Sequence, residues 1–473
     1  MNPLIKTAAF ADNFLSKLFH SAHLPCSRAS RITGLLGLFI FALGLSFGKS
    51  LQLMGLGAML LGILLDPRSF WNTARTCPAI WLVVLFLVYV WLRTFAAIFV
   101  EAHLEAFRLA DGARKYSYMA IIPVLAWWMR GGEKTIMNFF VLTILSTTVY
   151  ILLFSGICFT EITMGRNMVL ELPTLVIAYS MFLSLLIFWM TVNCRTIPAA
   201  HARTLQGRMV ITGLWAVCMI ITSLSLAVLE ARTATAALIL CVFATLPFLL
   251  INFLRKKGML MSRRSAGLFT VLFLIGILLA SAGIFQVAVS KISENQNSFI
   301  QLKQRFRGDV QVLKHLMTSG ELEGTPITSL GERVYMWAVA ADLFQEKPLL
   351  GHGRGVVIII PDAAGPPGAM RTTPHFHNTI IEALVAWGVA GTALLLAIFI
   401  IMLMNIHQAW KNKKMGLEMY LFLMGGALLV AVSGMTHSLG VRQTTWTYAA
   451  LWAGPAFSYC FRNLSAGDFK RNM

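Results

Sequence analysis

Five arginines and one histidine are the side chains of this 473-residue chain best suited to a phosphate-bearing substrate. They are Arg93, Arg232, Arg333, Arg354, Arg442 and His377. A guanidinium group presents five donors in one plane and matches phosphate oxygens, and a histidine takes up a proton near neutral pH. The set predicts an electropositive, outward-facing cavity for an anionic lipid headgroup such as a pyrophosphate, with His377 as the candidate for proton chemistry.

Ordinary roles compete with this interpretation. An arginine at a membrane interface reaches water with its charged end, which would explain Arg232 and Arg442 equally well. Arg93 is harder to explain in this way, because a charge inside a membrane span usually faces a polar cavity or a partner. A histidine that caps the next helix or satisfies the loop is the plainer interpretation of His377. Glu382, just past it, would either orient His377 or pair with an arginine.

Metal and cofactor chemistry find little support. The outward-facing loop holds no acidic pair at ligand spacing, and the seven cysteines show no CxxC spacing, so neither a zinc site nor a disulfide framework is indicated. The turn Gly351-His-Gly-Arg-Gly355 has glycines but not the Gly-Lys-Ser/Thr of a phosphate-binding loop. We therefore expect no metal and no cofactor. Three further histidines in the same compartment are fallbacks for His377: His352, His375 and His437.

The composition sets the environment of these residues. Hydrophobic residues make up 57% of the chain and charged residues 12%, whereas a soluble chain carries about 25% charged residues. The apolar residues form blocks of about 18–25, the length that crosses a hydrocarbon core of about 30 Å. The net charge of +19 sits mostly in short clusters between these blocks, which is the pattern of orientation signals. It therefore indicates membrane lipids as partners and argues against nucleic-acid binding.

The expected fold is an all-α polytopic membrane protein with about twelve spans. These are 32–48, 51–66, 78–100, 117–129, 135–158, 173–193, 209–229, 233–254, 266–290, 379–406, 416–437 and 444–461. Basic residues mark every second loop, so both termini should be cytoplasmic. The expected division is 1–31 as an interfacial segment, 32–290 as spans one to nine, 291–378 as a large extracytoplasmic loop, 379–461 as spans ten to twelve, and 462–473 as a cytoplasmic tail.

The large loop carries the remaining local signals. Apolar residues at helical spacing predict a helix over 291–317. Ser329-Leu-Gly-Glu332 has the form of a capping box and predicts a second helix over about 330–346, which Pro348 would end. The segment His375-Phe-His-Asn378 stands where the tenth span begins. The loop would therefore bring Arg333, Arg354 and His377 to the extracytoplasmic surface of the membrane.

Several of these motifs together resemble the O-antigen ligase and polymerase superfamily. They are Arg333-x-x-x-Trp337, Lys347-Pro-Leu-Leu-Gly351-His-Gly353, His377-Asn378 with Gly388 eleven residues after the histidine, and Ala231-Arg232-Thr233. Trp337 stands where the family pattern has a leucine-like residue, a modest departure. Chain length, the loop after the ninth span and the absence of an added C-terminal domain look most like an O-antigen ligase.

The resemblance implies a fold, substrates and a reaction. The fold would be the multi-helix C-type glycosyltransferase class. An undecaprenyl-diphosphate-linked O-antigen would be transferred, with inversion, to a sugar hydroxyl of the lipid A-core at the periplasmic face, without metal or nucleotide. His377 would be the general base, and Arg333 and Arg232 would hold the diphosphate. Arg93, Arg354 and Arg442 are further candidates for that role.

Three other functions stay open. An O-antigen polymerase or a protein O-oligosaccharyltransferase would share the superfamily motifs, and the sequence separates them poorly from a ligase. A secondary transporter would suit twelve spans. Transporters usually show matching halves with broken helices, however, and the chain shows no convincing internal repeat.

Overall fold

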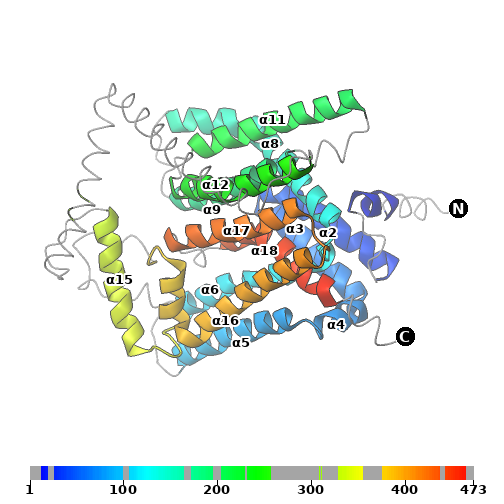
Figure 1. The fold of residues 1–473 in the computed structure, drawn as a ribbon. Helices are drawn as coiled ribbons and strands as arrows, with labels where there is room; N and C mark the ends of the chain where they lie inside the picture. Colours follow the sequence, from blue (N-terminus) through cyan, green and yellow to red (C-terminus); the bar gives the residue numbers. More distant parts are fainter. Residues whose placement is uncertain are drawn as a thin grey trace.

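The computed structural model describes residues 12–19, 26–99, 106–163, 172–194, 204–228, 232–256, 308, 311, 329–354, 375–436 and 443–464. Within this part of the chain the regular elements are helices, and no strand occurs. Most helices run roughly alongside one another as a bundle, and α15 (Ser329–Glu346) lies across one end of it (Figure 1). The expectation of an all-helical chain is confirmed for the described residues.

Seven described helices contain a stretch long and apolar enough to cross a membrane. They are α2 (Arg28–Phe47), α5 (Pro78–Phe99), α8 (Glu133–Thr163), α11 (Leu205–Val228), α12 (Arg232–Lys256), α16 (Thr379–Lys411) and α17 (Leu417–Thr436). The pair α3 (Lys49–Leu65) and α4 (Pro67–Ala74), bent by 91°, would make an eighth. Many of their outward side chains are apolar and exposed, as expected of surfaces that face lipid. The chain is therefore a multi-pass membrane protein.

The described residues do not reach the expected count of twelve spans. In place of the fourth stand a 3-10 turn, η1 (Tyr118–Ala120), and α7 (Ile121–Met129). These elements continue directly from α6 (Ala106–Ser117), so the helical run covers 106–129 and is longer than the span expected at 117–129. The expected sixth span, 173–193, is observed as α9 (Leu172–Val192), whose side chains are described from Tyr179 onward. The ninth, 266–290, lies outside the described residues, as does the helix expected over 291–317.

The expected twelfth span, α18 (Gln443–Leu464), is a central helix of the bundle. Every residue from 451 to 461 is buried, and α18 packs against α7, α9, α16 and α17. Small residues allow this close contact: a Cβ added to Gly454 would lie 3.0 Å from Leu125 Cβ. A helix covered by protein on all sides needs no apolar face toward lipid, which explains why α18 falls short of the hydropathy of a span.

The two ends of the bundle differ. The start of α16 and the whole of α15 lie at one end, and the helix over 12–18, α4 and the last turn of α18 lie at the other (Figure 1). The helix predicted over about 330–346 is observed as α15. Arg333, Arg354 and His377 are therefore gathered at the end of the bundle that holds α15 and the start of α16.

Candidate functional site

The site is built around a break in α16. Gly388 has φ 61° and ψ −168°, so the helix stops and restarts there. The turn over 347–353 fills the break and satisfies the backbone groups that the interrupted helix leaves open. Four hydrogen bonds do this: Val389 N to Pro348 O at 2.8 Å, Ala390 N to Leu349 O at 3.1 Å, His352 N to Val385 O at 2.9 Å and Gly353 N to Ala386 O at 2.8 Å. The turn and the broken helix thus form one backbone unit.

Two glycines make this unit possible. Both have a positive φ, 68° at Gly351 and 61° at Gly388, a conformation that costs glycine little and other residues more. A Cβ on Gly388 would lie 2.3 Å from Leu349 O, and one on Gly351 would lie 2.5 Å from Gly388 N. No side chain fits in either place, which gives a physical reason for the spacing of the motif glycines.

Side chains of helix α5 bind the backbone of the turn. Arg93 Nε donates a hydrogen bond of 2.7 Å to Gly351 O, and the Arg93 side chain is buried. The Tyr89 hydroxyl lies 3.0 Å from Leu350 O and 2.8 Å from Trp387 O. The expected partner of the intramembrane arginine is therefore a backbone carbonyl of the motif turn. The sequence analysis missed Tyr89, although its position four residues before Arg93 on one helix face was a usable signal.

Arg354 and Glu382 form a buried ion pair. Arg354 Nη1 lies 3.0 Å from Glu382 Oε1, with side-chain exposures of 5% and 1%. Glu382 Oε2 accepts a hydrogen bond of 3.0 Å from Phe376 N, and the stem of Arg354 packs against Gly112 of α6 (Ala106–Ser117). Glu382 therefore pairs with an arginine, one of the two roles considered for it, and it also accepts a hydrogen bond from the backbone of Phe376, the residue before His377.

His377 occupies a strained position directly before α16. Its φ is 53°, and its ring lies 4.1 Å from the ring of His375, centroid to centroid. The helix cap is Asn378, whose Oδ1 accepts hydrogen bonds from Ile380 N at 2.9 Å and Ile381 N at 3.2 Å. Asn378, and not His377, is therefore the cap of α16.

The His377 imidazole is partly buried and lies in the field of Arg333. Its Nδ1 is buried and has no hydrogen-bond partner among the described residues. Burial, and after it the charge of the nearby Arg333 guanidinium, lowers the pKa of His377 from 6.5 to about 4. The imidazole is neutral at physiological pH, the state in which it can act as a base.

Helix α15 brings Arg333 to this place. Trp337 Nε1 donates a hydrogen bond of 2.9 Å to Phe376 O, next to His377. Met336 and Ala340 of α15 pack with Phe376 and Val385 in a small buried cluster. Since Arg333 and Trp337 are four residues apart, they share one face of the helix. This pairing explains why the two residues belong to a single motif.

The remaining candidates are placed only in part. Arg232 is the first residue of α12, and its side chain is not among those described. Arg442 and His437 lie outside the described residues. His352 is buried in the turn with Nε2 2.7 Å from Leu343 O, and burial lowers its pKa. No group of three or more His, Cys, Asp or Glu residues in the described part of the chain could hold a metal ion.

A comparison with family models gives the family of this region. Residues 217–396 match the model described as O-Antigen ligase. This region is similar to the O-antigen ligase family, and we refer to it below as the ligase-family domain. The match supports membership of the O-antigen ligase and polymerase superfamily and confirms the resemblance seen in the motifs. No curated protein matches the chain.

The ligase-family domain contains most of the geometry described above. It begins in α11 and ends in the second part of α16, so it includes Arg333, Arg354, His377 and Glu382. Arg93 and Tyr89, which hold the motif turn, come from α5 outside the matched residues. The ligase-family domain therefore depends on the N-terminal part of the bundle to position its backbone.

Proposed function

We propose that this protein is an O-antigen ligase. It transfers a glycan from undecaprenyl diphosphate to a sugar hydroxyl of the lipid A-core at the periplasmic face of the bacterial inner membrane. The observation that carries the proposal is the neutral His377 imidazole beside Arg333, inside the ligase-family domain. A base can accept the proton of the attacking hydroxyl, and a neighbouring cation can stabilise the anionic diphosphate that leaves the sugar.

The proposed reaction is a single inverting displacement. His377 takes the proton of the acceptor hydroxyl as the oxygen attacks the anomeric carbon. The bond from that carbon to the diphosphate oxygen breaks, and the electron pair leaves with the diphosphate. Arg333 stabilises the charge that develops there, an interaction already oriented before the reaction starts. A diphosphate is a good leaving group, so no general acid is invoked.

The arginines divide into two groups in this proposal. Arg333 and Arg232, with Arg442, are the candidates for contact with the diphosphate. Arg354 and Arg93 act as positioning residues, because they are buried and engaged by Glu382 and by Gly351 O. This division departs from the expectation that all five arginines hold the diphosphate.

Binding of the donor should also tune the base. The positive charge of Arg333 contributes to the low pKa of His377. A diphosphate beside Arg333 would oppose that field and raise the pKa of His377 toward neutrality. The base would then be strongest in the complex that reacts.

The proposed topology keeps twelve spans, with both termini cytoplasmic and 291–378 as the periplasmic loop. The division into 1–31, 32–290, 379–461 and 462–473 belongs to the same proposal. Support comes from the placement of the helix over 12–18 and the last turn of α18 at the end of the bundle opposite α15 (Figure 1).

Formation of a lipopolysaccharide ladder in a strain that lacks its own ligase tests the function. Wild type should restore the ladder, and His377→Gln and Arg333→Gln should lose it at matched membrane levels. Arg114→Gln is the control, because Arg114 is an exposed residue of α6 paired only at the surface. A ladder restored by His377→Gln would remove the base from the mechanism.

The same assay separates the ligase from a polymerase. Loss of a ligase leaves finished polymer on the lipid carrier, whereas loss of a polymerase leaves single repeats on the core. If wild type restores no ladder with its own donor and core supplied, but lengthens single repeats in a polymerase-deficient strain, the ligase assignment is wrong.

A further inference from the structure

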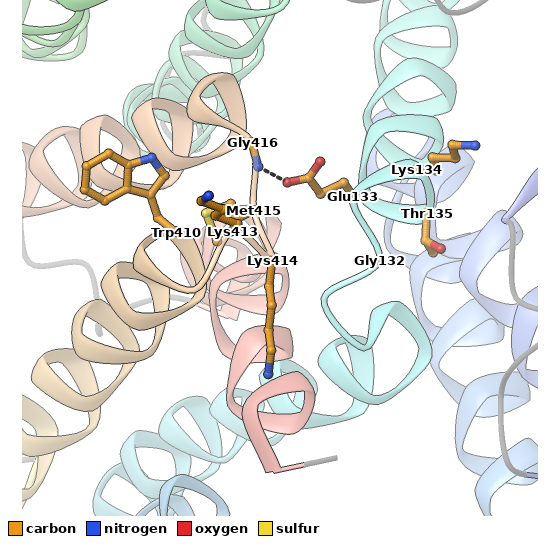
Figure 2. A pocket seen from close by; sticks show the side chains of 9 residues that line it. All are labelled: Gly132, Glu133, Lys134, Thr135, Trp410, Lys413, Lys414, Met415 and Gly416. Carbon is orange, nitrogen blue, oxygen red and sulfur yellow. Dashed lines mark hydrogen bonds between the residues drawn. The ribbon is translucent and has the colours of Figure 1, made fainter. Parts of the chain in front are cut away.

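A second polar hollow lies at the other end of α16. It is a cavity of about 570 Å³ between the first turn of α8 and the loop that joins α16 to α17 (Figure 2). The lining residues are Gly132, Glu133, Lys134, Thr135, Trp410, Lys413, Lys414, Met415 and Gly416. Helix α16 begins next to His377 and ends at this cavity, so the two sites lie at opposite ends of the bundle. The proposed reaction makes no use of it.

The charge of the cavity is unbalanced. Three lysines line it, and its one lining carboxylate, Glu133, accepts a hydrogen bond from Gly416 N, while Glu418 Oε2 would lie 3.7 Å from a Cβ added to Gly416. That hydrogen bond ties α8 to the start of α17 and holds the walls together (Figure 2). Figure 2 also shows Lys414 extending between the two segments, whereas Lys134 points away from the α16–α17 loop. Among the described residues, neither Lys413 nor Lys414 forms a salt bridge, so the cavity favours an anion.

Aromatic side chains place the cavity at the level of lipid headgroups. Trp410 stacks on Tyr420 with ring centroids 4.5 Å apart and an interplanar angle of 16°, and the ring of His407 lies 5.9 Å from Trp410. Tryptophan and tyrosine gather where the hydrocarbon meets the polar headgroups, because their rings are apolar with one polar atom. Trp410 is 39% exposed, so it is available to a lipid at the cavity edge.

An apolar surface leads along α16 toward the cavity. Leu396, Ile400 and Met404 follow at intervals of four residues and are about half exposed, at 47%, 51% and 54%. Residues four apart on a helix lie one above the other, so these side chains form a stripe that an acyl chain could cover. A molecule with an anionic head and an apolar tail matches the cavity and the stripe together.

We propose that this cavity binds the phosphate headgroup of an anionic phospholipid, with Lys413 and Lys414 as its ligands. The lipid's tail lies along Leu396, Ile400 and Met404. Lysine suits this task, since it binds phosphate as a compact point charge. The volume also falls in the range of small-molecule sites, about 300–1,000 Å³.

Native mass spectrometry of the purified full chain in detergent, with added phosphatidylglycerol or phosphatidylethanolamine, tests the proposal. Wild type should retain phosphatidylglycerol in preference to the zwitterionic lipid. Lys413→Gln/Lys414→Gln should weaken retention about thirtyfold, since each of the two lysines near an anionic surface contributes on the order of 1 kcal/mol. Lys413→Arg/Lys414→Arg keeps the charge and should retain the lipid, which guards against an effect of misfolding.

A charge-matched control separates a built site from general attraction to the membrane. Arg68→Gln/Arg75→Gln also removes two positive charges, and both residues are exposed, in or directly after α4, and outside the cavity. Equal loss of lipid in this control and in Lys413→Gln/Lys414→Gln would overturn the proposal. So would the absence of a preference for phosphatidylglycerol in wild type.

A final arm distinguishes the lipid from a free anion. Inorganic phosphate at millimolar concentration should leave the melting temperature of wild type unchanged, because it lacks the tail that the stripe would cover. If phosphate alone stabilises wild type but not Lys413→Gln/Lys414→Gln, and phosphatidylglycerol is not retained, the cavity is a site for a soluble anion and the lipid proposal is wrong.

Discussion

Gly351 and Gly388 meet backbone to backbone, so closely that a Cβ on Gly351 would lie 2.5 Å from Gly388 N. One belongs to the turn before the histidine motif, and the other lies inside the helix after it. Their contact joins the turn to the break in α16. It thereby fixes the position of the first part of that helix, which begins directly after His377. The glycines of the motif are thus structural elements of the site, although neither carries chemistry.

Gly388→Ala should destabilise the protein. The new Cβ would lie 2.3 Å from Leu349 O at a φ of 61°, and a residue held in a sparsely populated conformation costs on the order of 1–3 kcal/mol before the clash is counted. Thermal unfolding in detergent measures the effect. Gly213→Ala in α11 is the control, because nothing lies within 4 Å of its added Cβ. Equal melting temperatures for the two variants would contradict the close contact.

Glu382→Leu should destabilise the protein more than the double variant Arg354→Met/Glu382→Leu. The single change leaves a buried arginine without its carboxylate, which costs about 3–5 kcal/mol, whereas replacing both members by apolar groups is often nearly neutral. Thermal melting of the two single variants and the double variant, as a double-mutant cycle, measures the coupling. Additive effects of the two changes would show that the 3.0 Å contact contributes little.

Much of this fold could be predicted from local patterns. Apolar runs of membrane length correspond to α2, α5, α16 and α17, and a capping box with a following proline marked α15 almost to the residue. Both signals depend on residues close together in the chain. The motif around Gly351 and His377 was also visible, because its spacing is fixed by one turn and one helix start.

What could not be predicted depends on contacts between distant segments. A single glycine inside an apolar run costs about 1 kcal/mol and does not by itself announce a break, so Gly388 looked like part of a continuous span. The break exists because the turn over 347–353 supplies replacement hydrogen bonds. Arg93 was recognised as an expensive charge, but its partner, Gly351 O, is 258 residues away.

Trp337→Phe should lower kcat without preventing folding. The change removes the hydrogen bond of 2.9 Å to Phe376 O and keeps an aromatic ring in the cluster that docks α15. One such bond contributes about 0.5–1.5 kcal/mol, so a fall in kcat of about two- to tenfold is expected if the bond positions His377. Ligation by purified protein with lipid-linked glycan and lipid A-core measures it. A change in KM alone would assign Trp337 to substrate binding instead.

The pH dependence of ligation should depend on which constant is measured. The pKa of His377 is about 4 without substrate, and kcat/KM reports the free enzyme. Since the neutral form is the base, kcat/KM should fall as the pH drops through about 4. The fall in kcat should occur at higher pH, because the bound diphosphate raises the pKa of His377.

Arg333→Gln provides the decisive comparison for that pH dependence. The Arg333 charge helps to lower the pKa of His377, so removing it should move the acid limb of kcat/KM to higher pH while the overall rate falls. Arg114→Gln, which alters a surface arginine of α6, should leave the limb in place. Acid limbs that coincide for kcat and kcat/KM, and do not move in Arg333→Gln, would mean that His377 is not the group whose protonation limits the reaction.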